Sequence, residues 1–221
     1  MTHFAVILPA AGFSVRFGGS RSKLAEPLDG IPVLMRAMRA FADRADVSHV
    51  VVATREFWVG AEKVIQCEGG PTRAHSVLNA LRAVPLEIEW VAIHDAARPL
   101  VSQGLIDRTL AAALEHGAAV PAMPVALTIK QATGPLPARV ERTVPRDQLW
   151  AMQTPQVMRR ATLLDAFERC PIPLDQVTDD VQLLELAGQA VWLVPGDEQN
   201  LKITTPMDLK LAELWLIGAK N

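Results

Sequence analysis

The chain has 221 residues, 50% of them hydrophobic, and a formal net charge of −2. This length suits one domain spanning residues 1–221, and the apolar content excludes an intrinsically disordered chain. No apolar run reaches the roughly 18 residues of a membrane span, and the small net charge provides no bulk field for nucleic acid or anionic lipid. The sequence therefore predicts a globular domain that binds neither membrane nor nucleic acid and meets anionic ligands with local charges.

Cysteine usage and the first residues predict a cytoplasmic protein. Cys67 and Cys170 are too few for a thiolate zinc site or a disulfide framework. The start, Met-Thr-His-Phe, leads directly into an apolar segment without the basic region of a signal peptide. The five histidines show no H-E-x-x-H or similar ligand spacing, so we expect no zinc site.

The first 125 residues alternate predicted strands and helices. Apolar runs predict strands over 4–8, 49–53, 64–68, 90–93 and 118–125. Apolar residues at helical spacing predict helices from Pro32 to about residue 43, around 77–84 and over 102–117, the last capped by Ser102 and ended by Gly117. This alternation is typical of a layered α/β domain with helices on both faces of a mainly parallel sheet.

Residues 126–147 interrupt the alternation. Two β-prone runs, 127–131 and 139–144, flank a segment that contains Gly134, Pro135 and Pro137. The pattern predicts a protruding hairpin with too little apolar surface to be stable alone, so the hairpin should lean on another surface. The α/β pattern then returns, with helices predicted over 160–169, 178–187 and 209–217 and a strand over 190–194.

A loop of small residues, 9–12, follows the first strand and leads into the basic residues Arg16, Arg21 and Lys23. Backbone N–H groups in such a loop can surround a phosphate. The Rossmann, P-loop and serine-hydrolase glycine patterns are all absent from this segment. Two interpretations remain: a solvated basic loop, or a phosphate-binding loop in which arginine forks and a movable lysine charge contact the oxygens.

A second polar cluster, residues 94–99, begins where a predicted parallel strand ends. Open α/β sheets bind ligands beyond the carboxyl ends of their strands. Asp95 can hold a metal or a hydroxyl there, or it can cap the following turn while Arg98 pairs with it. His94 is assigned no chemistry, because a lone histidine at a strand end is more often a hydrogen-bonded core residue.

Five short motifs stand in register along the chain. They are Pro9-Ala10-Ala11-Gly12-x-x-x-Arg16 with Lys23, Arg73-Ala74-x-Ser76-Val77, His94-Asp95-Ala96-Ala97-Arg98-Pro99, Thr154-Pro155-Gln156 and Asn200-x-Lys202-x-Thr204. Taken together, from about Phe4 to Ile217, they resemble the 2-C-methyl-D-erythritol 4-phosphate cytidylyltransferases. The resemblance implies a three-layer, Rossmann-like nucleotidyltransferase α/β sandwich, with the arm at 126–147 crossing the interface of a homodimer.

The resemblance also implies the reaction. The family joins CTP to 2-C-methyl-D-erythritol 4-phosphate, giving CDP-methylerythritol and pyrophosphate for isoprenoid synthesis by the non-mevalonate pathway. The substrate's own phosphate is the nucleophile, so catalysis rests on alignment and on neutralising charge at the α-phosphate. By resemblance, Arg16 and Lys23 are the transition-state cations, and Mg²⁺ bridges the triphosphate oxygens. Whether Asp95 also contacts the metal is left open.

The resemblance divides the remaining site residues by ligand. The nucleotide-binding residues hold the cytosine mainly through backbone atoms: Pro9, Ala10, Ala11, Gly12, Gly69, Gly70, Ser76 and Ala96. The sugar-phosphate site is lined by Asp95, Arg98, Thr128, Thr154 and Thr178, and its substrate is positioned by Arg146 and Lys202. Thr128 and Arg146 lie on the arm, and by resemblance they close the site of the other subunit.

The chain departs from the family pattern in three places. Leu24 stands where a polar residue usually follows the lysine, Pro71 replaces an acidic residue near the base, and Ala126-Leu127 replaces an Arg-Asp pair. Pro71 removes a backbone donor. The Ala126-Leu127 change removes two charges near the sugar-phosphate, so it bears on the choice of acceptor.

Three alternatives therefore stand beside this function. A ribitol 5-phosphate cytidylyltransferase would use the same loop chemistry. A non-catalytic nucleotide-binding homologue would not need both Arg16 and Lys23. A nucleotide-sugar glycosyltransferase would ordinarily show a D-x-D motif, and Asp95-Ala96-Ala97 lacks the second acid.

Overall fold

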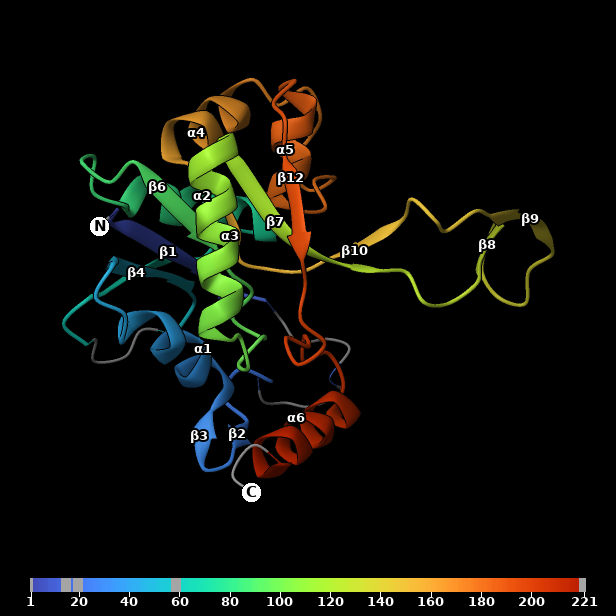
Figure 1. The fold of residues 1–221 in the computed structure, drawn as a ribbon, viewed down its shortest axis with the longest axis horizontal. Coiled ribbons are helices and arrows are strands. Elements are labelled where there is room, and N and C mark those ends of the chain that lie inside the picture. Colours follow the sequence, from blue (N-terminus) through green and yellow to red (C-terminus); the bar gives the residue numbers. More distant parts are fainter. Residues whose placement is uncertain (1, 13–16, 18–21, 57–60, 219–221) are drawn as a thin grey trace.

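The computed structural model describes residues 2–12, 17, 22–56 and 61–218. Within these residues one sheet of eight strands forms the centre of the molecule (Figure 1). Six strands lie side by side in the order β5 (Val64–Glu68), β4 (Val47–Thr54), β1 (Phe4–Pro9), β6 (Trp90–Ile93), β11 (Gln156–Arg159) and β7 (Ala118–Pro124). The strands β10 (Trp150–Met152) and β12 (Trp192–Pro195) also pair with β7. The β5, β4, β1 and β6 strands are parallel, whereas β11 runs antiparallel to both of its neighbours.

Helices cover both faces of this sheet. The helices α1 (Val33–Ala42) and α3 (Gln103–His116) pack on one face, and α2 (Arg73–Ala83), α4 (Arg160–Glu168) and α5 (Asp180–Leu186) pack on the other. The β1 strand shows why two cores form, because Phe4 and Val6 point into the first core and Ala5 and Ile7 into the second. All four side chains are fully buried, as expected for a strand covered on both faces. The predicted three-layer α/β sandwich is confirmed.

The last helix and a small ribbon lie at one end of the molecule. The helix α6 (Pro206–Gly218) contacts the short ribbon formed by β2 (Pro27–Leu28) and β3 (Ile31–Pro32). No helix in the described ranges is both long and apolar enough to cross a bilayer.

Local end signals in the sequence explain most helix boundaries. The Ser102 hydroxyl accepts a hydrogen bond from the Leu105 N–H, and Gly117 ends the same helix with φ of 94°, as predicted. The helix predicted over 178–187 begins later, at Asp180, because the Asp179 carboxylate caps it by accepting the Gln182 N–H. Thr178 consequently lies outside this helix.

The sequence did not predict the strands β10 and β11. The β11 strand has four residues, and only Val157 and Met158 among them are apolar, so its own pattern is too short to indicate a strand. It forms because both of its edges are paired, one with β6 and the other with β7. Pairing between distant segments thus places Thr154 and Gln156 beside the end of β6.

The arm at 126–147 is a hairpin that projects away from the sheet, as predicted (Figure 1). Among the described residues, its strands β8 (Ile129–Ala132) and β9 (Val140–Val144) pair only with each other. Every residue from 126 to 147 is described and none is buried; Leu127 and Leu136 are 78% and 87% exposed. At the base of the arm the Arg146 guanidinium donates to the Ala126 carbonyl.

Candidate active site

A pocket of about 390 Å³ opens where the parallel strands end. Its walls come from the segments that follow β1, β4, β5 and β6, together with residues 23–24 and a segment preceding α6. The lining residues are Pro9, Ala11, Gly12, Lys23, Leu24, Arg55, Gly70, Pro71, Thr72, Arg73, Ser76, Asp95, Ala96, Ala97, Lys202 and Thr204. This is the place where open α/β sheets bind ligands.

One wall is made of small residues in close contact. A Cβ at Gly69 would lie 2.0 Å from the Ala11 Cβ, so the loops after β1 and β5 can approach each other only because residue 69 is glycine. The Gly70 N–H donates to the Ser76 hydroxyl at 3.0 Å, and this hydroxyl donates to the Thr72 carbonyl at 3.0 Å. The only hydroxyl proton of Ser76 is thereby used, which leaves the oxygen a lone pair with which to accept from a ligand.

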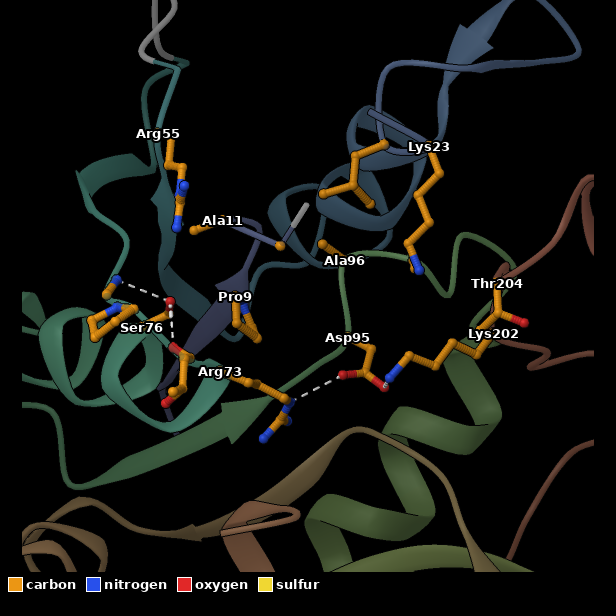
Figure 2. Close-up of a pocket in the computed structure, with 16 residues that line it drawn as sticks. Pro9, Ala11, Lys23, Arg55, Arg73, Ser76, Asp95, Ala96, Lys202 and Thr204 are labelled. Carbon is orange, nitrogen blue, oxygen red and sulfur yellow. Dashed lines mark hydrogen bonds and ion pairs between the residues drawn. The ribbon is translucent and has the colours of Figure 1, made fainter. Parts of the chain in front are cut away.

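The opposite wall is organised around the Asp95 carboxylate. Its oxygens lie 3.4 Å from Arg73 Nε, 3.4 Å from Arg98 Nε and 2.9 Å from Lys202 Nζ. Burial alone would raise the pKa of Asp95, but the charges of Arg73, Lys202 and Arg98 hold it well below its usual range. Asp95 is therefore ionised, and Figure 2 shows its carboxylate between Arg73 and Lys202.

Arg73 joins Asp95 to a second carboxylate. Arg73 Nη2 lies 2.8 Å from Asp180 Oδ2, and the Asp180 side chain is almost fully buried on α5. Burial disfavours the charged guanidinium, yet Asp180 and Asp95 together raise the pKa of Arg73. Burial raises the pKa of Asp180, against the opposing charge of Arg73. Arg73 is thus held from both sides, with α2 tied to α5 and to the end of β6.

The two lysines of the pocket converge on one segment. Lys23 Nζ donates to the Ile203 carbonyl at 2.8 Å, between Lys202 and Thr204 in the chain. The Ile203 N–H donates to the Ala97 carbonyl at 2.8 Å, so this segment is fixed against the loop after β6. Figure 2 shows both lysine amines on the same side of the pocket as Asp95, away from Ser76. This side carries positive charge, because Arg73, Arg98 and Lys202 already outnumber the two carboxylates before Lys23 is counted.

The structure brings nine of the residues predicted for the site into the pocket lining. They are Pro9, Ala11, Gly12, Lys23, Gly70, Ser76, Asp95, Ala96 and Lys202. Arg16 lies outside the described residues. Thr128 and Arg146 lie on the arm and do not line the pocket of their own chain.

Four other predicted residues do not face the pocket. Arg98 and Thr154 are buried behind Asp95. Arg98 forms the ion pair with Asp95 that was one of the two alternatives for this cluster. Ala10 packs against the core, and its N–H donates to the Ala53 carbonyl. Thr178 is exposed, and both its N–H and its hydroxyl donate to Gln182 Oε1. Thr178 therefore does not line the pocket of its own chain. Its role at the sugar-phosphate stays a prediction.

The lining also contains residues for which no role was predicted. Arg73 and Thr204 stood inside recognised motifs, so a signal for them existed. Arg55 follows the end of β4, and the strand-end rule that singled out Asp95 applies equally to it. Thr72 and Ala97 are brought in by the segments that carry Arg73 and Asp95.

Comparisons with known proteins agree with this geometry. A family model described as 2-C-methyl-D-erythritol 4-phosphate cytidylyltransferase matches residues 4–217. Proteins of that name from Gloeobacter violaceus and Symbiobacterium thermophilum are 41% and 42% identical, over 96% of this chain and 95% and 92% of theirs. A crystal structure of the same-named protein from Francisella tularensis superposes with a TM-score of 0.85 at 32% identity, covering 96% of this chain and 99% of that one.

His94 lies beneath Asp95 and is fully buried, as predicted for a core histidine. Burial lowers its pKa to about 4, although the Arg98 carbonyl and Asp95 act in the opposite direction. In the unfolded chain the histidine has a pKa near 6.5. Between about pH 4 and pH 6.5 the unfolded chain therefore binds a proton at this residue, whereas the folded chain does not. Stability from the neutral imidazole is therefore complete above about pH 6.5 and is lost as the pH falls toward 4.

We expect this proton to appear in the pH dependence of unfolding. The free energy of unfolding of the wild type should fall relative to that of His94→Gln by about 1.4 kcal/mol per pH unit between pH 6 and 4.5. Urea unfolding of both proteins across this range measures the difference. Parallel pH profiles would show that His94 titrates alike in both states.

Proposed function

The chain belongs to the 2-C-methyl-D-erythritol 4-phosphate cytidylyltransferase family, and we propose that the pocket beyond β1 and β6 carries the family's reaction. It transfers CMP from CTP to 2-C-methyl-D-erythritol 4-phosphate, giving CDP-methylerythritol and pyrophosphate in isoprenoid precursor biosynthesis. The observation that carries this assignment of the site is the pairing of a tight small-residue wall with a cationic wall ordered around Asp95. The first suits a flat base, and the second suits phosphates.

The small-residue wall explains a preference for cytosine. The loops after β1 and β5 touch at Ala11 and Gly69, so a purine would have to displace backbone rather than rotate a side chain. The free lone pair of Ser76 can accept from the exocyclic amino group of cytosine. Uracil carries an acceptor at the same place, and two acceptors facing each other are unfavourable. We assign Ser76 and the Gly70 segment to this recognition.

The cationic wall explains catalysis without a protein nucleophile. The acceptor's phosphate attacks the α-phosphate of CTP, and pyrophosphate leaves from the opposite side. Lys23 and Lys202 enter the pocket together, where they can neutralise the reacting phosphates and hold them in line. The ionised Asp95 keeps lone pairs for a hydroxyl of the acceptor. Arg16, assigned from the motif alone, adds a second cation at the α-phosphate.

The described residues do not fit a magnesium site built by the protein. They contain no group of three or more His, Cys, Asp or Glu side chains placed to hold a metal. Asp95 is already held by three cations, and Asp180 is buried beneath Arg73. We propose that Mg²⁺ is held mainly by the triphosphate oxygens of CTP, where it neutralises charge on the leaving group.

We further propose a homodimer in which each arm completes the partner's pocket. The arm exposes Leu127 and Leu136 and has no core of its own, and two-stranded hairpins are marginal in water unless they pack on another surface. Arg146 at its base offers a planar fork that can grip a phosphate in two places. Within the part of the chain that the structure describes, the Arg146 guanidinium donates locally, to the Ala126 carbonyl.

Incubating the protein with Mg²⁺, each of the four nucleoside triphosphates and each of two polyol phosphates tests the reaction. Pyrophosphate release should be at least about a hundredfold faster with CTP than with ATP, GTP or UTP, because a misfitting base disturbs the alignment of the α-phosphate. Methylerythritol phosphate should be the better acceptor. A preference for ribitol 5-phosphate would assign the chain to that activity, and no release from any mixture would indicate a non-catalytic nucleotide-binding protein.

Mixing two inactive variants tests the crossed arms. Lys23→Ala damages a chain's own pocket, whereas Arg146→Ala damages the partner's, so a heterodimer has one intact site and one doubly damaged site. Equal mixing with subunit exchange should restore roughly a quarter of wild-type activity, because about half the dimers then carry one working site of two. Mixing Lys23→Ala with Lys202→Ala is the control and should restore nothing. Failure of the first mixture despite demonstrated exchange would place Arg146 in its own chain's site.

A further inference from the structure

Behind the Asp95 wall, four residues close a ring of buried hydrogen bonds. Thr154 Oγ1 lies 3.0 Å from His94 Nδ1, and His94 Nε2 lies 3.0 Å from the Arg98 carbonyl. Arg98 Nη1 donates to the Asn200 carbonyl at 2.6 Å, and Asn200 Nδ2 donates to the Thr154 carbonyl at 2.8 Å. All four residues are at most 8% exposed. None of them lines the pocket.

The proton of each bond in the ring has a fixed direction. The Asp95 N–H can only donate, and it donates to Thr154 Oγ1 at 3.0 Å. The Arg98 carbonyl can only accept, so His94 carries its proton on Nε2. His94 Nδ1 is then an acceptor, and it receives the Thr154 hydroxyl proton. Burial, which holds the pKa of His94 near 4, keeps this imidazole neutral at neutral pH.

The ring connects the three segments that carry the acceptor side of the pocket. Thr154 precedes β11, His94 and Arg98 flank Asp95, and Asn200 stands two residues before Lys202. Two bonds connect the ring to Asp95: the Asp95 N–H donates to Thr154 Oγ1, and Arg98 Nε donates to the Asp95 carboxylate. The position of the Asp95–Lys202 pair therefore depends on groups that no ligand in the pocket touches.

We infer that His94, Thr154 and Asn200 are positioning residues of this enzyme, which act through one directional hydrogen-bond ring to set the place of Asp95 and Lys202. The inference rests on the proposed function, because it takes Asp95 and Lys202 as the groups that receive the acceptor. Thr154 belongs here rather than among the residues that touch the sugar-phosphate, since its hydroxyl is used on both sides within the protein. From the sequence, His94 is assigned no chemistry. In the structure it acts on the reaction indirectly, through Thr154 and Asp95.

Removing the Thr154 hydroxyl breaks both the ring and its bond to the Asp95 N–H. Thr154→Val keeps the shape of the side chain but leaves the Asp95 N–H and His94 Nδ1 unpaired and buried, a costly arrangement that displaces Asp95. We expect kcat/KM for methylerythritol phosphate to fall tenfold to a hundredfold, the scale of a small misplacement at a reacting centre, while KM for CTP changes by less than about twofold. His94→Gln, which keeps a donor for the Arg98 carbonyl but loses the acceptor for Thr154, should behave alike.

Two further variants separate positioning from stability. Thr154→Ser restores the hydroxyl and should recover activity to within about threefold of wild type. Thr109→Val also deletes a fully buried hydroxyl, one that donates only to the Leu105 carbonyl of its own helix, and it should leave both KM values and kcat unchanged. Equal losses in Thr154→Val and Thr154→Ser, or equal changes in the KM values for CTP and the acceptor, would overturn the inference.

The ring is also testable without any activity measurement. Long-range proton–nitrogen correlation spectra of the ¹⁵N-labelled wild type at pH 7, with His94 identified by its loss in His94→Gln, should show the proton on Nε2 and none on Nδ1. A proton on Nδ1, or on both nitrogens, would overturn the ring. Wild-type protein that releases no pyrophosphate but shows the Nε2 proton would refute the proposed function while leaving the ring in place, so the two failures are distinguishable.

Discussion

The arrangement of this site depends on one buried negative charge. Arg73, Arg98 and Lys202 come from separate parts of the chain, and three cations this close would repel one another without the Asp95 carboxylate between them. The carboxylate in turn could not stay ionised in its buried position without them. The three cations thus keep Asp95 ionised, and Asp95 in turn offsets the repulsion among the three cations. The result is an excess of positive charge held in a fixed geometry, which is what a site for two phosphates requires.

The fold supplies this constraint with rigid supports. The parallel strands β1, β4, β5 and β6 bring their ends to one edge, where the small-residue wall and the charged wall face each other. The antiparallel β11 then places Thr154 under Asp95, and the segment before α6 returns Lys202 to the same place. Preorganised charge is effective because it need not rearrange when the transition state forms. The ion pairs with Asp95 hold Arg73, Arg98 and Lys202 through contacts within the protein itself.

The sequence predicted the sheet and most of the site where the signal was local. Fully apolar runs mark β1 and β6, end signals such as Ser102 and Gly117 mark α3, and the motifs mark Lys23, Asp95 and Lys202. It did not predict β11, which forms only through pairing with distant strands, nor which side chains face the pocket. Arg98 and Thr154 have the residue types of a phosphate or hydroxyl site, yet Arg98 donates to the distant Asn200 carbonyl and Thr154 accepts the distant Asp95 N–H, both inside the protein. Such partners depend on tertiary contacts that no spacing along the chain records.

A double-mutant cycle on Asp95 and Lys202 tests most directly whether the carboxylate organises the cations. The cycle compares kcat/KM for methylerythritol phosphate in the wild type, Asp95→Asn, Lys202→Met and the double variant. If the two residues act as one unit, each single variant should lose about as much kcat/KM as the double variant. The fold-loss of the double variant should then be at least tenfold smaller than the product of the two single fold-losses. This corresponds to a coupling free energy of about 1.4 kcal/mol or more. Losses that simply multiply would show that Asp95 and Lys202 contribute independently, and the idea of a single organising charge would then be wrong.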